Sequence, residues 1–286
     1  MTNSLKLTIA QQNCVLADMD RNLGKHYQAI EEAIEQKSQL IVFPELSLSG
    51  YFLRDAVMDV ALHIDDKKLD KLRQLSEHIA IDVGLVELGD KFEFFNTQVV
   101  FYKGEIIARH RKVYLPTYSL FEEKRYFNAG TRIRAFDSPF GKIGLLICED
   151  MWHPTSSLIL AHDGASIIIV SAAGVARGIN ENEKPQNVQV WETLNHSMAV
   201  FTTSFIVFAN RVGVEEGVTF WGGSEIIHPS GLSLVQAPYF EEFNLHAEIN
   251  LLELKHARVN TQLLKEENFE LLQYEFKRIA EQNKNY

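Results

Sequence analysis

Residues 141–152 read Gly141-Lys-Ile-Gly-Leu-Leu-Ile-Cys-Glu-Asp-Met-Trp. The run over residues 143–147 is short, apolar and rich in branched side chains, which predicts a buried strand. Cys148 ends this strand, and the polar and aromatic residues after it are typical of a strand-to-helix elbow. Because sites in α/β proteins form at strand ends, Cys148 is a candidate site residue.

Cys148 alone does not establish a site, since a free cysteine most often serves as a small buried hydrophobe. Two other stretches favour a functional role. Residues 40–46, Leu40-Ile-Val-Phe-Pro-Glu-Leu, place Glu45 at the end of an apolar strand. Residues 109–116, Arg109-His-Arg-Lys-Val-Tyr-Leu-Pro, place Lys112 at the end of another. A thiol, a carboxylate and an ammonium group that each end a strand can converge at one edge of a sheet.

Such a trio has a chemical use. A thiol with an ordinary pKa of ~8.5 is mostly protonated at neutral pH. A nearby carboxylate can take its proton as the sulfur attacks, and a cation can stabilise the oxyanion that develops. The three residue types therefore suit nucleophilic catalysis.

The same three stretches carry a family resemblance. Phe43-Pro-Glu-Leu, Arg111-Lys-Val-Tyr-Leu-Pro and Ile147-Cys-Glu-Asp resemble, in order and spacing, the Glu, Lys and Cys motifs of the nitrilase superfamily, the carbon-nitrogen hydrolases. Around Cys148 and along residues 115–127 the sequence is most similar to the glutamine-amidase domain of glutamine-dependent NAD synthetases and to similar stand-alone amidases. The resemblance covers essentially the whole chain.

The expected fold is a layered α/β domain, because strand-rich and helix-rich segments alternate without a fixed repeat length. That pattern does not distinguish a doubly wound sheet from other layered folds. The resemblance implies a four-layer αββα sandwich, with two mixed sheets face to face and helices outside. With no linker in the sequence, we expect one domain over residues 1–286, in which residues 251–286 form a C-terminal helical tail.

The resemblance also implies a mechanism, hydrolysis of a linear amide C–N bond through a thioester on Cys148. Glu45 would act as base, then acid, then base again, and Lys112 would hold the oxyanion. Glu123 matches a further acidic position that supports the trio in this family, and the adjacent Glu122 is the alternative.

The residue after the nucleophile bears on specificity. In the superfamily nitrile hydrolysis usually accompanies Trp at this position, whereas amidases and glutaminases can have Glu, and this chain has Glu149. We expect Glu149, Tyr118 and Phe121 to bind substrate. Relatives commonly carry a Ser-Pro-like pair in a loop facing the substrate, where this chain has Ala172-Ala-Gly. A glutaminase subunit that supplies ammonia to a separate synthetase, a nitrile hydrolase and a catalytically silent scaffold remain alternatives.

Composition argues against several classes of protein. The chain has 28 Lys and Arg against 38 Asp and Glu, a net charge of −10, and no basic tract, which argues against nucleic-acid binding. The two cysteines, Cys14 and Cys148, form no disulfide framework, and no cysteine or histidine spacing matches a metal site. No cofactor is expected.

The longest uncharged run, residues 193–210, is interrupted by polar side chains and predicts a helix end followed by a buried strand rather than a membrane span. The N-terminal residues lack the apolar core of a signal peptide. We expect a cytoplasmic enzyme that acts on a small amide and, from the resemblance, forms a homodimer or higher homo-oligomer.

Overall fold

Two six-stranded sheets form the centre of the computed structural model, which describes residues 3–178 and 185–283. In spatial order the first sheet contains β14 (Phe243–Asn250), β1 (Ser4–Gln11), β2 (Leu40–Val42), β3 (Ala80–Leu88), β4 (Phe94–Tyr102) and β5 (Glu105–Arg111). The second contains β13 (Ser233–Gln236), β12 (Glu225–Ile227), β9 (Phe205–Asn210), β8 (Ile167–Ala172), β7 (Gly141–Ile147) and β6 (Ala135–Ser138).

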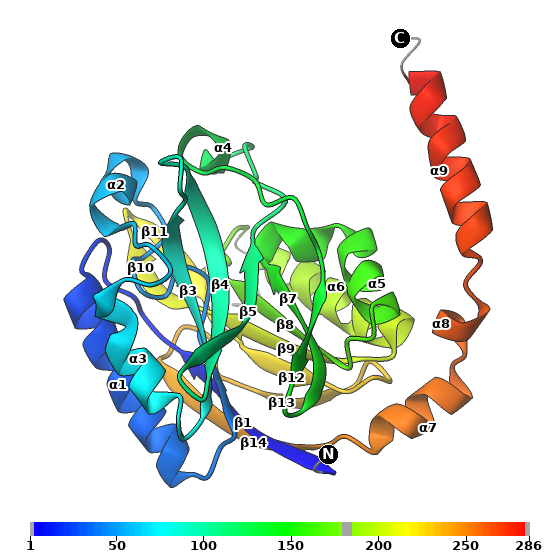
Figure 1. Ribbon diagram of the computed structural model, residues 1–286, viewed down its shortest axis with the longest axis horizontal. Helices are drawn as coiled ribbons and strands as arrows, with labels where there is room; N and C mark the ends of the chain where they lie inside the picture. Colours follow the sequence, from blue (N-terminus) through cyan, green and yellow to red (C-terminus); the bar gives the residue numbers. More distant parts are fainter. Residues whose placement is uncertain (1–2, 179–184, 284–286) are drawn as a thin grey trace.

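The sheets pack face to face through one apolar cluster, in which Leu7 and Ile9 of β1 lie with Leu145 of β7 and Ile169 of β8. Two further clusters bind the helices to the outer faces of the sheets. The first sheet is covered by α1 (Met19–Glu35), α2 (Val57–Val60) and α3 (Asp70–Leu75), and the second by α5 (Pro154–His162) and α6 (Gln186–Thr202) (Figure 1). This order of layers confirms the predicted αββα sandwich.

The central strands of the second sheet explain why it must be covered on both faces. β8 pairs in parallel with β7 and with β9, and every residue of β8 and β9 is buried. Strands buried on both faces need apolar residues throughout rather than in alternation. The sequences Ile-Ile-Ile-Val-Ser-Ala and Phe-Ile-Val-Phe-Ala-Asn meet that need.

Several predicted boundaries differ from the structure. The sequence predicts one helix over residues 66–80, whereas the chain forms a 3₁₀ turn, Lys67–Leu69, and then the short helix α3. The helix ends at Leu75, where the Ser76 hydroxyl donates to the Arg73 carbonyl at 2.6 Å, and β3 already begins at Ala80. The sequence also predicts a buried strand over residues 165–170, whereas β8 is Ile167–Ala172, so the small-residue loop after it begins two residues later than expected.

A two-stranded ribbon lies outside the two large sheets and was not predicted. It consists of β10 (Val212–Glu215) and β11 (Val218–Trp221), joined by a tight turn at Glu216 and Gly217. Its strands are only four residues long, which is too short for the alternation of apolar and polar residues that marks a strand to be recognised.

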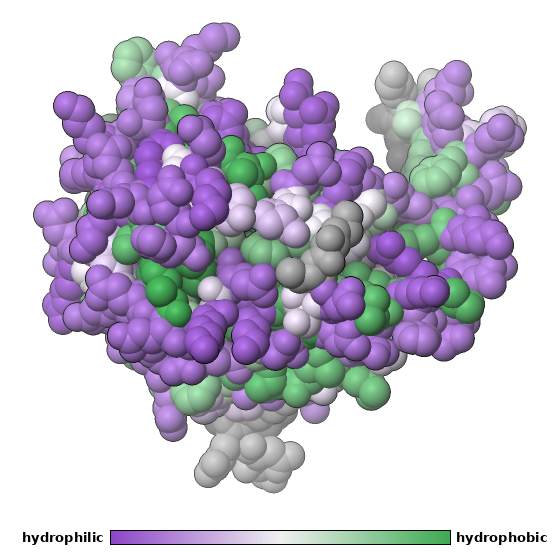
Figure 2. All heavy atoms as spheres, turned by 60° about the horizontal axis from the view of Figure 1, so that its bottom comes forward, coloured by the Kyte–Doolittle hydropathy of each residue, from purple (hydrophilic) through white to green (hydrophobic). Residues whose placement is uncertain are grey.

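The C-terminal segment forms three helices, α7 (Glu253–Asn260), α8 (Leu263–Glu266) and α9 (Phe269–Asn283), and α9 stands away from the sandwich (Figure 1). On the face shown in Figure 2 hydrophilic side chains dominate, and apolar side chains surface in separate patches. Among the helices of the described residues, none combines the length and the apolar composition that a membrane crossing requires.

Candidate active site

Lys112 lies between two carboxylates in the interior of the protein. Its Nζ is 2.7 Å from Glu45 Oε1 and 2.6 Å from Glu123 Oε1. All three side chains are buried, so these contacts are little weakened by water. Two segments that are 67 residues apart in sequence are thereby joined at one ammonium group.

Cys148 begins a 3₁₀ turn, Cys148–Trp152, directly after β7. Its φ is +46°, a left-handed conformation that is unfavourable for a residue with a side chain and that clusters at functional sites. The charges of Glu45, Lys112 and Glu123 all act on the thiol. The predicted elbow therefore exists, and the sulfur lies within electrostatic range of the buried ion pair.

Asp150 holds the elbow to the segment that carries Lys112. Its Oδ1 accepts hydrogen bonds from the backbone N–H groups of Val113, at 3.0 Å, and Tyr114, at 2.9 Å. Its Oδ2 accepts from the Ile147 N–H, at 3.1 Å, and from His110 Nε2, at 2.8 Å. The carboxylate is fully buried and bridges the end of β5 to the end of β7. We call this arrangement the Asp150 clasp.

Glu45 lies three residues beyond the end of β2, on a turn rather than at the strand terminus predicted from sequence. Three groups fix its carboxylate. Lys112 Nζ and Asn96 Nδ2 donate to Oε1, the latter at 2.8 Å, and the Ala173 N–H donates to Oε2 at 2.8 Å. The loop in which Ala172-Ala-Gly replaces the expected Ser-Pro-like pair thus contacts the site through its backbone.

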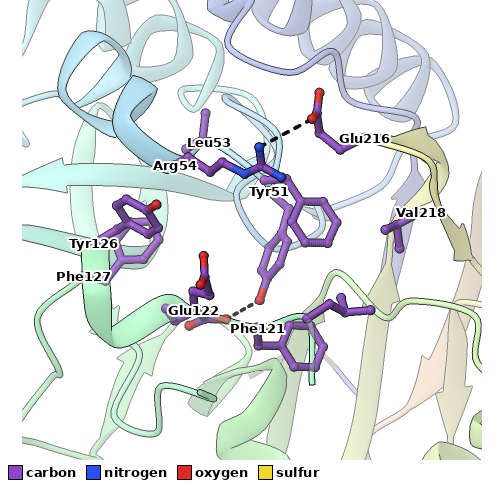
Figure 3. A pocket seen from close by; sticks show the side chains of 12 residues that line it. Tyr51, Leu53, Arg54, Phe121, Glu122, Tyr126, Phe127, Glu216 and Val218 are labelled. Carbon is purple, nitrogen blue, oxygen red and sulfur yellow. Dashed lines mark hydrogen bonds and ion pairs between the residues drawn. The ribbon is translucent and has the colours of Figure 1, made fainter. Parts of the chain in front are cut away.

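Glu123, rather than Glu122, contacts Lys112. Its Oε1 also accepts a hydrogen bond from the Tyr51 hydroxyl at 2.5 Å. Glu122 is exposed and lines a neighbouring cavity of about 150 Å³ that also contains Tyr51 and Phe121 (Figure 3). Burial raises the pKa of Glu123 to about 7, Lys112 opposes the rise, and the nearby Glu45 adds to it.

Tyr51 is positioned by a buried ion pair from the β10–β11 ribbon. Glu215 Oε1 accepts from the N–H groups of Tyr51, at 2.9 Å, and Phe52, at 2.5 Å, and its Oε2 accepts from Arg211 Nη1 at 2.7 Å. Gly50 has φ +81°, and a Cβ atom there would lie 2.8 Å from Glu215 Oε2. Only glycine lets the chain pass this close to the carboxylate.

The pKa values of the thiol and the ammonium group both rise. Burial raises the pKa of Cys148 well above its ordinary value, the Glu45 carboxylate adds to this, and Lys112 offsets only part of it. Burial lowers the pKa of Lys112, but the carboxylates of Glu123 and Glu45 outweigh that effect, and the net pKa is raised. At neutral pH the sulfur is therefore a thiol and the amine is a cation.

The sequence profile described as carbon-nitrogen hydrolase matches residues 6–259. The chain belongs to the carbon-nitrogen hydrolase family. A nitrilase from Pyrococcus abyssi is 30% identical over 264 residues, which cover 90% of this chain and 94% of that protein. The solved structure of a carbon-nitrogen hydrolase from Helicobacter pylori superposes with a TM-score of 0.84 at 25% identity, covering 93% of this chain and 96% of that one.

A glutamine-dependent NAD(+) synthetase from Aquifex aeolicus is 32% identical over 260 residues, which cover 89% of this carbon-nitrogen hydrolase. The match covers 44% of the synthetase. This hydrolase therefore spans less than half the length of that relative.

The three residues predicted to bind substrate lie together in the carbon-nitrogen hydrolase. The Tyr118 hydroxyl donates to Glu149 Oε2 at 2.9 Å, and the ring centroids of Tyr118 and Phe121 are 5.8 Å apart. The Arg177 guanidinium lies 4.7 Å from the centre of the Phe121 ring. Within the described residues its Nε and Nη2 atoms are buried and have no hydrogen-bond partner.

Sequence patterns did not identify Asn96, Ala173, Asp150, Glu215 or Arg177. Ala173 acts through its backbone, which no residue type can signal. The sequence gives a weak indication of a role for Arg177, because it is the one charged residue in Ser171-Ala-Ala-Gly-Val-Ala-Arg-Gly. Across residues 3–178 and 185–283 no group of three or more His, Cys, Asp or Glu side chains is placed to hold a metal ion.

Proposed function

We propose that this carbon-nitrogen hydrolase cleaves a linear amide through a thioester on Cys148. The observation that carries the proposal is the buried Lys112, paired with Glu45 and Glu123 beside the strained Cys148 elbow. This arrangement supplies a nucleophile, a base and a cation in one place.

In the first half of the reaction Glu45 accepts the thiol proton while the sulfur bonds to the amide carbon. A base is needed because the raised pKa keeps the thiol protonated at neutral pH. The carbonyl oxygen becomes an oxyanion, which Lys112 Nζ and the backbone N–H after Cys148 stabilise. Glu45 then passes the proton to the nitrogen, the C–N bond breaks, and ammonia or an amine leaves.

The second half returns the enzyme to its starting state. A water molecule gives a proton to Glu45 as its oxygen bonds to the thioester carbon. The C–S bond then breaks, the carboxylic acid leaves, and the proton on Glu45 returns to the sulfur. Glu123 holds Lys112 in place through both halves, and Tyr51 holds Glu123.

The side chains around the site favour an amide that carries both an ammonium and a carboxylate group, as glutamine does. Glu149 offers a carboxylate for the ammonium group, and the unpaired nitrogens of Arg177 offer donors for the carboxylate. The similarity to glutamine-dependent synthetases supports the same choice. A glutaminase that passes its ammonia to a separate synthetase would use the same residues in the same steps.

The test is ammonia release from glutamine, asparagine, aliphatic amides, carbamoyl amines and nitriles. Cys148→Ala should lower release by roughly 10³-fold or more, as loss of a nucleophile does in other hydrolases. Cys14→Ala is the matched control, because Cys14 is the other buried cysteine and its carbonyl group, which alanine keeps, accepts the hydrogen bond from Arg211. Release from no substrate, or undiminished release by Cys148→Ala, would contradict the proposal and favour a silent scaffold.

The substrate class gives a separate prediction. Arg177→Ala should raise the KM for glutamine by about 10- to 100-fold, the equivalent of one lost charge-assisted contact, and should leave the KM for propionamide nearly unchanged. Arg54→Ala is the control, because Arg54 lines the neighbouring cavity and pairs with the exposed Glu216. An equal rise for both amides would show that Arg177 shapes the site without recognising a carboxylate.

A further inference from the structure

A pocket of about 300 Å³ lies where the edge strands of the two sheets meet, outside the catalytic site. β5 is the edge strand of the first sheet, and the other wall is the segment that leads into β6, the edge strand of the second. The pocket is lined by Arg109, His110, Arg111, Gly130, Thr131, Arg132, Arg134 and Phe136. Four arginines thus share one concavity.

Two of the arginines are held in place by a buried carboxylate. Arg109 and Arg111 are two residues apart on β5 and so project from the same face of the strand. Both bind Glu87 Oε1, at 3.3 Å and 2.5 Å, and the Glu87 side chain is 2% exposed. The Arg111 guanidinium also lies 3.7 Å from the centre of the Phe95 ring. These two guanidinium groups are therefore ordered without any ligand.

The other two arginines have no counter-charge. Arg132 and Arg134 are exposed, and the described part of the chain offers neither side chain a hydrogen bond or an ion pair. The residues that line the pocket include four arginines and no carboxylate, and Glu87, the partner of Arg109 and Arg111, is not among them. This excess of positive charge stands out on a chain whose net charge is −10.

The segment that carries Arg132 and Arg134 is fixed against β5. The Gly130 N–H donates to the Lys112 carbonyl at 2.7 Å. A Cβ atom on Gly130 would lie 2.1 Å from the Arg111 carbonyl oxygen, so only glycine allows the two segments to run this close. The pocket walls are thus set by backbone contacts.

We propose that this pocket binds a compact oxyanion with more than one negative charge, such as a diphosphate group or a tricarboxylate. Guanidinium groups bind phosphate and carboxylate oxygens in pairs, and a concave cluster of one sign concentrates the potential that attracts such an ion. The pocket volume lies at the lower end of the range for small-molecule sites and is too small for a macromolecular surface. A monoanion would leave most of the excess charge uncompensated.

The test is isothermal titration of the full chain with inorganic pyrophosphate, citrate and acetate, in the absence of any amide. Pyrophosphate or citrate should bind saturably and more tightly than acetate. The double variant Arg132→Ala/Arg134→Ala should weaken that binding by about tenfold or more, because it removes the two unpaired guanidinium groups. Tighter binding of pyrophosphate would identify the ligand as a diphosphate group, and tighter binding of citrate would identify it as a tricarboxylate.

Arg21→Ala/Lys91→Ala is the matched control, because it removes two exposed cations that lie outside the pocket. It should bind like the unchanged chain. Saturable binding of neither polyanion, or equal binding by the Arg132→Ala/Arg134→Ala variant, would overturn the proposal. Since the titration needs no turnover, its outcome does not depend on whether the chain hydrolyses amides.

Discussion

Glu45→Gln should lower kcat by about 10²- to 10⁴-fold, the usual contribution of a positioned general base. Glutamine keeps an oxygen that can accept from Lys112 and Asn96, so the ammonium group retains one partner at this position. It cannot take the thiol proton, and the raised pKa of Cys148 means that little thiolate forms without a base. Both the acylation and the deacylation steps should slow, because Glu45 takes a proton in each.

Asp82→Asn is the matched control for this substitution. Asp82 is a fully buried carboxyl group on β3 whose pKa burial raises well above its ordinary value, and its Oδ2 accepts from Gln98. Asparagine keeps an oxygen that can accept from Gln98, so it is a close replacement for this buried group. Activity of Glu45→Gln within about threefold of the unchanged chain, roughly 0.7 kcal/mol, would rule out Glu45 as the base.

Asp150→Asn is the second variant with a large expected effect. An amide has one acceptor oxygen, so its NH₂ group would face either the N–H groups of Val113 and Tyr114 or those of Ile147 and His110. Two buried donors then lose their partner, at about 1–3 kcal/mol each. We expect a lower melting temperature and, because the Cys148 elbow is no longer fixed to the Lys112 segment, a fall in kcat of about 10²-fold.

The role of the Asp150 clasp can be separated from a general loss of stability. kcat and KM should be measured well below the melting temperature of the variant, together with the rate at which iodoacetamide alkylates Cys148. A positioning role predicts a fall in kcat and a changed alkylation rate at nearly constant KM. His110→Gln, which keeps a donor toward Asp150 Oδ2, should retain more activity than His110→Ala. Unchanged kcat in the folded Asp150→Asn variant would contradict the positioning role.

The sequence predicted the parts of the fold that follow from periodicity and from strong local signals. The uncharged run over residues 193–210 forms the end of α6 and then the buried strand β9, as expected. The prediction over residues 66–80 was wrong at its C-terminal end, because the Ser76 side chain bonds to the Arg73 carbonyl there, a local hydrogen bond that competes with helical pairing. The β10–β11 ribbon was missed because it is short, and with it the ion pair that positions Tyr51.

The candidate site likewise has residues that the sequence predicts and contacts that it does not. Cys148, Glu45, Lys112 and Glu123 carry chemically distinctive side chains in motifs, so it could be predicted from the sequence that they lie close together. The Asp150 clasp could not, because an aspartate two residues after a cysteine gives no sign that four donors from two sheets will surround it. Tertiary contacts of this kind depend on which strand ends meet, and only the folded chain shows that.

The most direct test of the account is mass spectrometry of the intact chain quenched during turnover of a slow amide, followed by peptide mapping. The account predicts a mass increment equal to the acyl part of the substrate, located on Cys148, absent from Cys148→Ala and removed on further incubation in water. An active chain that never carries this increment, or carries it on another residue, would contradict the thioester mechanism.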